Sequence, residues 1–200
     1  MNKNKVSHVV VSLALFHWLV IIAANYSLYL DLHTVGNMML WDFIFPLTFI
    51  SSLWTTLYYG DISKQAIYIS AVPVWLVSYI VTDSSGPVLG THPLQLATAA
   101  CVAYAIGQLL AIHLYEKIRY RVRWPFPLLL ALCVGSFVDL LVFYSTVIMC
   151  SLQNALVWLN AGISDLGTRS LVYCLFVIPV CMTVRLMVWI VDFVNQDKML

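Results

Sequence analysis

The sequence predicts an all-α fold, a polytopic membrane protein in which six transmembrane helices form one domain over residues 1–200. Of its 200 residues, 62% are hydrophobic and only 10% are charged, whereas a soluble domain has about 45–50% apolar and about 25% charged residues. The mean hydropathy is +0.91. The net charge of +1 provides no basic surface for nucleic acid. These values exclude a soluble enzyme, a nucleic-acid-binding protein and a disordered chain.

Six apolar runs approach the roughly 20 residues that a helix needs to cross a bilayer. In chain order they cover residues 9–29, 40–59, 66–81, 94–115, 126–152 and 166–194. We expect residues 153–165 to form a loop or an interfacial turn. Pro46, Pro73 and Pro179 fall inside runs and therefore predict kinks.

The first run has a basic start, like a signal peptide, but it differs in other respects. It is long, it is interrupted by His17, Trp18 and Asn25, and no A-x-A cleavage site follows it. We expect a retained helix.

The positions of the basic residues predict the orientation. Cytoplasmic segments of membrane proteins carry an excess of Lys and Arg. With the N-terminus inside, eight of the ten Lys and Arg residues fall in inner segments, and among the outer segments only Arg169 is basic. Both termini are therefore expected in the cytoplasm, in a multi-pass protein of the bacterial inner membrane.

Small residues recur every four positions in the fourth run. They are Ala99, Ala103, Gly107 and Ala111. Such a stripe lets another helix approach closely, and we expect this partner to be a helix of the same chain.

Asp139 is the main candidate for a functional residue. It lies near the middle of the fifth run, about 20 Å from its cytoplasmic end at 1.5 Å per residue. A charge at this depth costs at least about 2.5–3.5 kcal/mol on insertion scales, so it indicates a function by default. Two interpretations stay open: a substrate or proton site, or a structural acid that pairs with Arg185 in the sixth run.

Other polar and aromatic residues extend the candidate site. Asp165 and Arg169 are four residues apart and can form a helix ion pair or act at the mouth of a pathway. The amides of Gln108 and Asn25 each need up to four hydrogen-bond partners. Further candidates are the hydroxyl of Ser136 and the rings of Phe45 and Phe143, which can stack on a flat ligand or simply pack.

The sequence contains no signature of a membrane enzyme. It lacks H-E-x-x-H, G-x-S-x-G and a phosphate-binding loop, and its five cysteines include no C-x-x-C pair. We expect no catalytic residue, no metal site and no cofactor. Binding or translocation is favoured over a membrane enzyme or assembly factor.

Several segments resemble the queuosine-precursor transporters, also called the vitamin uptake transporter (VUT) family. The similar segments are L-F-H-W-L-V-I with Asn25-Tyr26, F-I-F-P-L-T-F at 43–49, A-Y-A-I-G-Q at 103–108, Asp139 with Phe143, and Asp165 with Arg169. The resemblance runs from about Leu13 to Val191. The sequence differs from the family at Leu53 and Leu57, where the family has an Asp and an Arg, and at Ala111, where it often has an acid.

This resemblance implies six helices, a fold like that of the substrate-binding subunits of energy-coupling-factor vitamin importers, and uptake of deazaguanine precursors of the tRNA base queuosine. A carboxylate such as Asp139 can pair with the adjacent N–H and amine of a guanine-like edge. Gln108 and Asn25 can complement its other atoms, while an aromatic ring stacks on its face.

The expected partners are a purine-like base and the lipid bilayer. We favour a stand-alone transporter. The alternative is a substrate-binding subunit that needs an ATPase partner, and a homo-oligomer also stays open.

Overall fold

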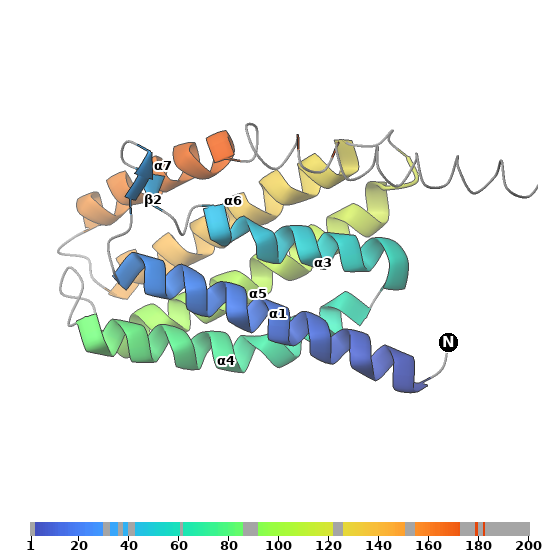
Figure 1. The fold of residues 1–200 in the computed structure, drawn as a ribbon. Helices are drawn as coiled ribbons and strands as arrows, with labels where there is room; N and C mark the ends of the chain where they lie inside the picture. The colour runs from blue at the N-terminus through green and yellow to red at the C-terminus, as the bar shows by residue number, and fades with distance from the viewer. Residues whose placement is uncertain are drawn as a thin grey trace, which may run out of the picture.

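The structure, a computed structural model, is an almost wholly helical bundle (Figure 1). It describes residues 3–29, 33–35, 38–39, 43–60, 62–85, 92–121, 126–150 and 155–172, together with residues 179 and 182. The helices are α1 (Lys3–Tyr29), α3 (Pro46–Tyr59), α4 (Ile62–Ser85), α5 (Pro93–Ile118), α6 (Phe126–Cys150) and α7 (Ala155–Val172). Two short strands, β1 (His33–Val35) and β2 (Met38–Met39), pair antiparallel between α1 and α3.

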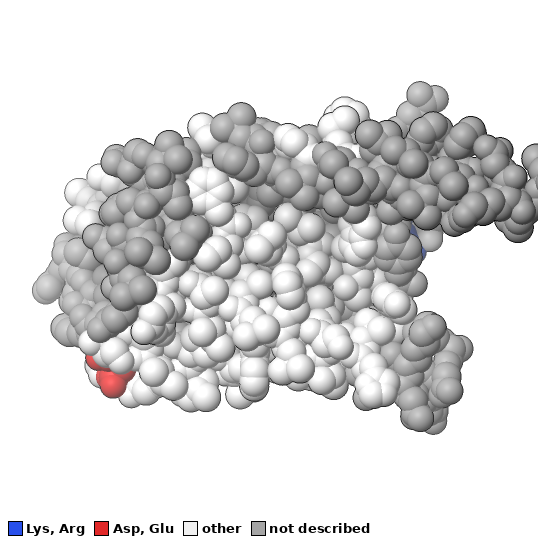
Figure 2. Space-filling view, viewed as in Figure 1, with Lys and Arg blue, Asp and Glu red and all other residues white. Residues whose placement is uncertain are grey.

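Within the described residues, four helices are long and apolar enough to cross a membrane. Their candidate spans are His8–Ser27, Ile62–Ser84, Pro93–Ile118 and Phe126–Met149. The face of the molecule in Figure 2 agrees with this, because its described charged atoms lie near the two ends of the bundle and the described surface between them is uncharged. The chain is therefore a multi-pass membrane protein.

The second predicted span is shorter than expected. Residues 43 and 44 are helical, but the chain turns at Phe45, and α3 begins at Pro46. Pro46 therefore starts a helix rather than kinking one, because a proline at the first helical position gives up no hydrogen bond. With 14 residues, α3 is about 21 Å long, less than the roughly 30 Å of a bilayer core.

The loop expected over residues 153–165 is wrong, because α7 is already helical from Ala155 onwards. The sixth predicted span, residues 166–194, therefore shares its first residues with a helix that starts earlier. Beyond Val172 almost all of that span lies outside the described residues. Pro73 lies inside α4, which stays helical through it, whereas the surroundings of Pro179 lie outside the described part.

Helix α5 is the central element, and it packs against α4 on one side and α6 on the other. Helix α1 packs mainly on α4, and α7 packs on α6. The core between α3, α5 and α6 is apolar, with Phe49, Leu53, Ile112 and Leu132 fully buried.

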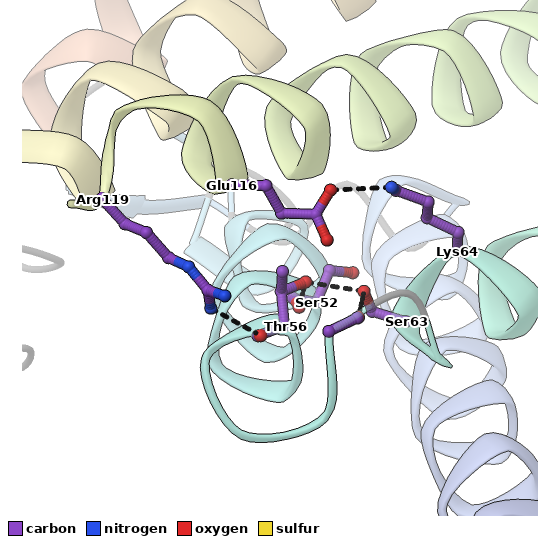
Figure 3. Close-up of polar contacts among 7 residues, drawn as sticks. Ser52, Thr56, Ser63, Lys64, Glu116 and Arg119 are labelled. Carbon is purple, nitrogen blue, oxygen red and sulfur yellow. Dashed lines mark hydrogen bonds and ion pairs between the residues drawn. The ribbon is translucent and has the colours of Figure 1, made fainter. Parts of the chain in front are cut away.

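Polar contacts join α3, α4 and α5 at one end of the bundle (Figure 3). Lys64 Nζ of α4 lies 2.7 Å from Glu116 Oε2 of α5. Arg119, which follows α5, donates to the Thr56 carbonyl near the end of α3 at 3.2 Å. Such a cation suits the negative end of a helix. The Thr56 hydroxyl also lies 2.6 Å from that of Ser63, so three helices are tied together where basic residues gather.

Candidate functional site

A buried ion pair connects α6 to α7. Arg169 Nη1 lies 2.7 Å from Asp139 Oδ2, and both side chains are almost fully buried. Asp139 is therefore paired, as the structural interpretation of the sequence expected, and its partner among the described residues is Arg169. Arg185 lies outside the described residues.

Phe45 completes the surroundings of this ion pair. The central carbon of the Arg169 guanidinium lies over the Phe45 ring, 4.9 Å from its centroid, within the range of a cation–π contact. Phe45 occupies the turn immediately before α3, and its ring meets that of Phe49 edge-on, with centroids 6.1 Å apart. An aromatic surface and a carboxylate therefore converge on one planar cation.

Two glycines bring α5 and α6 close together beside Asp139. A Cβ atom on Gly107 would lie 2.7 Å from Asp139 Cβ and 2.9 Å from the Gly135 carbonyl oxygen. A Cβ atom on Gly135 would lie 2.6 Å from Ala111 Cβ. Real Cβ atoms do not approach so closely, so this crossing requires glycine on both helices. The internal partner predicted for the small-residue stripe is thus α6.

Gln108 links this helix crossing to α3. Its Nε2 donates to Thr48 Oγ1 at 2.7 Å, and the side chain is fully buried. Its Oε1, however, is buried without a hydrogen-bond partner among the described residues, although such an orphaned acceptor costs about 1–3 kcal/mol. The hydroxyl of Ser136, one residue after Gly135, is likewise buried and without a partner there.

Asp165 and Arg169, for which a helix ion pair was one of two open interpretations, take different hydrogen-bond partners. Asp165 Oδ2 accepts from the Tyr144 hydroxyl of α6 at 2.5 Å, whereas Arg169 is held by Asp139. Asp165 lies one helical turn before Arg169 in α7, so two carboxylates flank this arginine. Two polar contacts consequently hold α7 to α6.

Asn25 and Phe143 lie in other surroundings. The Asn25 amide donates to the Ile21 carbonyl of its own helix at 2.9 Å, and no hydrogen bond joins it to Asp139 or Gln108 in the part of the chain that the structure describes. Phe143 packs with Ala99, Val147 and the Tyr144 ring. Of the predicted residues, the structure thus gathers Asp139, Arg169, Phe45, Gln108 and Ser136 around the convergence of α3, α5, α6 and α7.

The sequence interpretation did not single out a buried histidine that bridges three helices. His17 of α1 is fully buried. Its Nδ1 lies 2.6 Å from the Tyr104 hydroxyl of α5, and its Nε2 lies 2.9 Å from the Ser51 hydroxyl of α3. The sequence does contain a signal for this residue, because a titratable histidine ring inside an apolar run indicates a buried polar contact.

Three positions at which the sequence differs from the resembled family, Leu53, Leu57 and Ala111, carry apolar side chains, and their surroundings differ. Leu53 is fully buried in the core, Ala111 lies against Gly135, and Leu57 is 41% exposed.

The fold and the buried polar residues define the class: a multi-pass helical membrane protein with a polar site among its helices. The chain is a homologue of curated proteins named queuosine precursor transporter. It is 27% identical over 181 residues to the queuosine precursor transporter of Escherichia coli K12. The alignment covers 84% of this chain and 82% of that protein. It is 24% identical over 168 residues to a protein of Haemophilus influenzae named "probable queuosine precursor transporter", covering 72% of each.

These homologues confirm the resemblance stated from the sequence. No protein-family model matches the chain, and no solved structure matches it.

Proposed function

We propose that this protein is a bacterial inner-membrane transporter that imports a queuosine precursor, a 7-deazaguanine-type base or queuine, for tRNA modification. The observation that carries the proposal is the buried Asp139–Arg169 pair beside the Phe45 ring. The names of the two homologues support the same substrate class.

The chemistry of the site suits a flat base with hydrogen-bond donors along one edge. A carboxylate accepts two adjacent N–H groups in a charge-assisted pair, which assigns this role to Asp139. Phe45 offers a face for stacking, which contributes about 1–3 kcal/mol per base in nucleic-acid complexes. Gln108 and Ser136 hold buried polar atoms without partners among the described residues, and a bound base would satisfy them.

For the membrane topology we propose six spans with both termini in the cytoplasm. The basic residues predict this orientation through the positive-inside rule. The contacts of Lys64, Glu116 and Arg119 then lie at the cytoplasmic end of α3, α4 and α5. A reporter fused to either terminus should report from the cytoplasm, and a signal from outside the cell would overturn the topology.

We propose that the chain works alone rather than as the binding subunit of an ATPase-driven importer. Both homologues are named transporters, and the A-x-x-x-A pattern by which such subunits dock is absent from the first apolar run.

The test is uptake of radiolabelled 7-deazaguanine by proteoliposomes that contain this chain and no other protein. We expect uptake above that of empty liposomes, with inhibition by unlabelled 7-deazaguanine and none by an unrelated vitamin such as riboflavin. Binding without uptake would favour the ATPase-dependent subunit. Neither binding nor uptake of any deazaguanine would refute the proposed substrate class.

A further inference from the structure

Arg169 combines three features that a bound base would also need. Its planar cation lies over the Phe45 ring at 4.9 Å, its Nη1 donates to Asp139 Oδ2 at 2.7 Å, and its side chain is 7% exposed. A side chain of the protein itself is thus flat, donates an N–H to the carboxylate and is buried against an aromatic ring.

A guanidinium and the edge of a 2-amino-4-oxopyrimidine ring have closely similar chemistry. Both present adjacent N–H groups in one plane, and both match the two oxygens of a carboxylate. Because Arg169 Nη1 already donates to Asp139 Oδ2, this carboxylate cannot at the same time accept both N–H groups of a base edge with its two oxygens. The two groups must compete for Asp139.

We infer that the Arg169 guanidinium occupies the position of the ligand's amino-pyrimidinone edge, and that the ligand displaces it from Asp139. This inference rests on the proposed function and adds the ligand edge that is read and the residue that competes with it. Arg169 is accordingly a regulator of affinity at this site rather than a permanent contact of the ligand.

A second carboxylate is available to receive the displaced arginine. Asp165 lies one turn before Arg169 on α7, and its Oδ2 is held by the Tyr144 hydroxyl. A move of the guanidinium from Asp139 toward Asp165 keeps the cation beside an acid. Leaving a buried charge unpaired would be strongly unfavourable, so this second acid makes the exchange feasible.

Gln108 supplies an independent observation for a ligand at this place. Its Oε1 is fully buried and has no hydrogen-bond partner in the described part of the chain, although its Nε2 is satisfied by Thr48. Gln108 follows Gly107 in α5. Because Gly107 has no side chain, Asp139 can lie directly against it. A buried acceptor without a partner, on the residue next to the contact with Asp139, matches a ligand that brings N–H donors.

The experiment compares the wild type with Arg169→Ala in nanodiscs by titration calorimetry with 7-deazaguanine. Without the tethered competitor, Arg169→Ala should bind 7-deazaguanine about tenfold more tightly, as expected when about a tenth of the wild-type sites are free. Methylguanidine, a detached copy of the arginine head group, should weaken this binding in Arg169→Ala and have no effect on the wild type. The control Arg121→Ala removes an exposed arginine and should behave as the wild type.

The possible failures are distinguishable. If the wild type does not bind 7-deazaguanine, the proposed function fails. If the wild type binds it but Arg169→Ala binds no more tightly and ignores methylguanidine, the inference about Arg169 is overturned while the function stands.

If Arg169→Ala does not fold, the wild type itself provides the test. The arginine side-chain NMR signals, assigned with Arg169→Lys, should shift for Arg169 when 7-deazaguanine is added. An Arg169 signal that stays unchanged at saturating ligand would overturn the inference.

Discussion

Arg169 Nη1 and Asp139 Oδ2 lie 2.7 Å apart in the interior of the bundle, although the two residues are separated by 30 positions in the sequence. Each side chain neutralises the other where water is excluded. The same pair connects α6, which carries Asp139, to α7, which packs against it.

Removing one member of this pair should destabilise the protein more than removing both. Asp139→Asn or Arg169→Gln leaves one buried charge without its partner, which costs about 3–5 kcal/mol. The double variant Asp139→Asn/Arg169→Gln removes both charges and should recover most of that loss. Thermal unfolding in one detergent, with the exposed Asp83→Asn as the control, measures this. Losses that simply add in the double variant would contradict the pairing.

The contact between α5 and α6 predicts a strong effect of one methyl group. Gly107→Ala places a Cβ atom 2.7 Å from Asp139 Cβ and 2.9 Å from a backbone oxygen, and such overpacking costs about 1–3 kcal/mol. Gly167→Ala is the matched control, because a Cβ atom there meets nothing within 4 Å. Equal melting temperatures for the two variants would show that the helices do not cross as described.

The bridge at His17 predicts a loss of stability from removal of one oxygen atom. Tyr104→Phe deletes the hydroxyl that lies 2.6 Å from His17 Nδ1 and leaves that buried nitrogen without this partner, at a cost of about 1–3 kcal/mol. Tyr68→Phe changes a ring that is 65% exposed and should have no effect. A melting temperature of Tyr104→Phe equal to that of Tyr68→Phe would refute the role of this bridge.

Gln108 should affect ligand affinity more than stability. Gln108→Met keeps the length of the side chain and removes both the orphaned Oε1 and the hydrogen bond from Nε2 to Thr48. We expect a melting temperature near that of the wild type, because relief of the orphaned acceptor offsets the lost bond and the Thr48 hydroxyl still donates to the Phe45 carbonyl. Affinity for 7-deazaguanine should fall about 3- to 10-fold, the equivalent of one hydrogen bond. Calorimetry with the exposed Gln65→Met as the control tests this, and an unchanged affinity would remove Gln108 from the site.

The sequence predicted the membrane class and the positions of the longest helices because both depend on local composition. The expected starts at Leu94 and Phe126 agree within a residue with α5 and α6. The start of α7 was wrong, because its first turns contain polar residues such as Asn160 and Ser164 that lower the hydropathy without preventing a helix.

The candidate site was predictable only in part. Burial of a charge is costly anywhere in a membrane, so Asp139 stood out from its position in the run alone. Its partner Arg169 did not, because this pairing depends on how α7 packs on α6, which no local pattern encodes. Asn25 was expected at the site for its amide, yet that amide bonds to its own helix, as local side-chain contacts often do.

Uptake of radiolabelled 7-deazaguanine by proteoliposomes containing Asp139→Asn, compared with the wild type and with Asp83→Asn, tests the central claim most directly. Asparagine keeps the size of the side chain but replaces one accepting oxygen with a donor, so it cannot accept both N–H groups of the base. We predict that uptake by Asp139→Asn falls to the level of empty liposomes while Asp83→Asn matches the wild type. Wild-type uptake by a folded Asp139→Asn would contradict the assignment of Asp139 to the ligand.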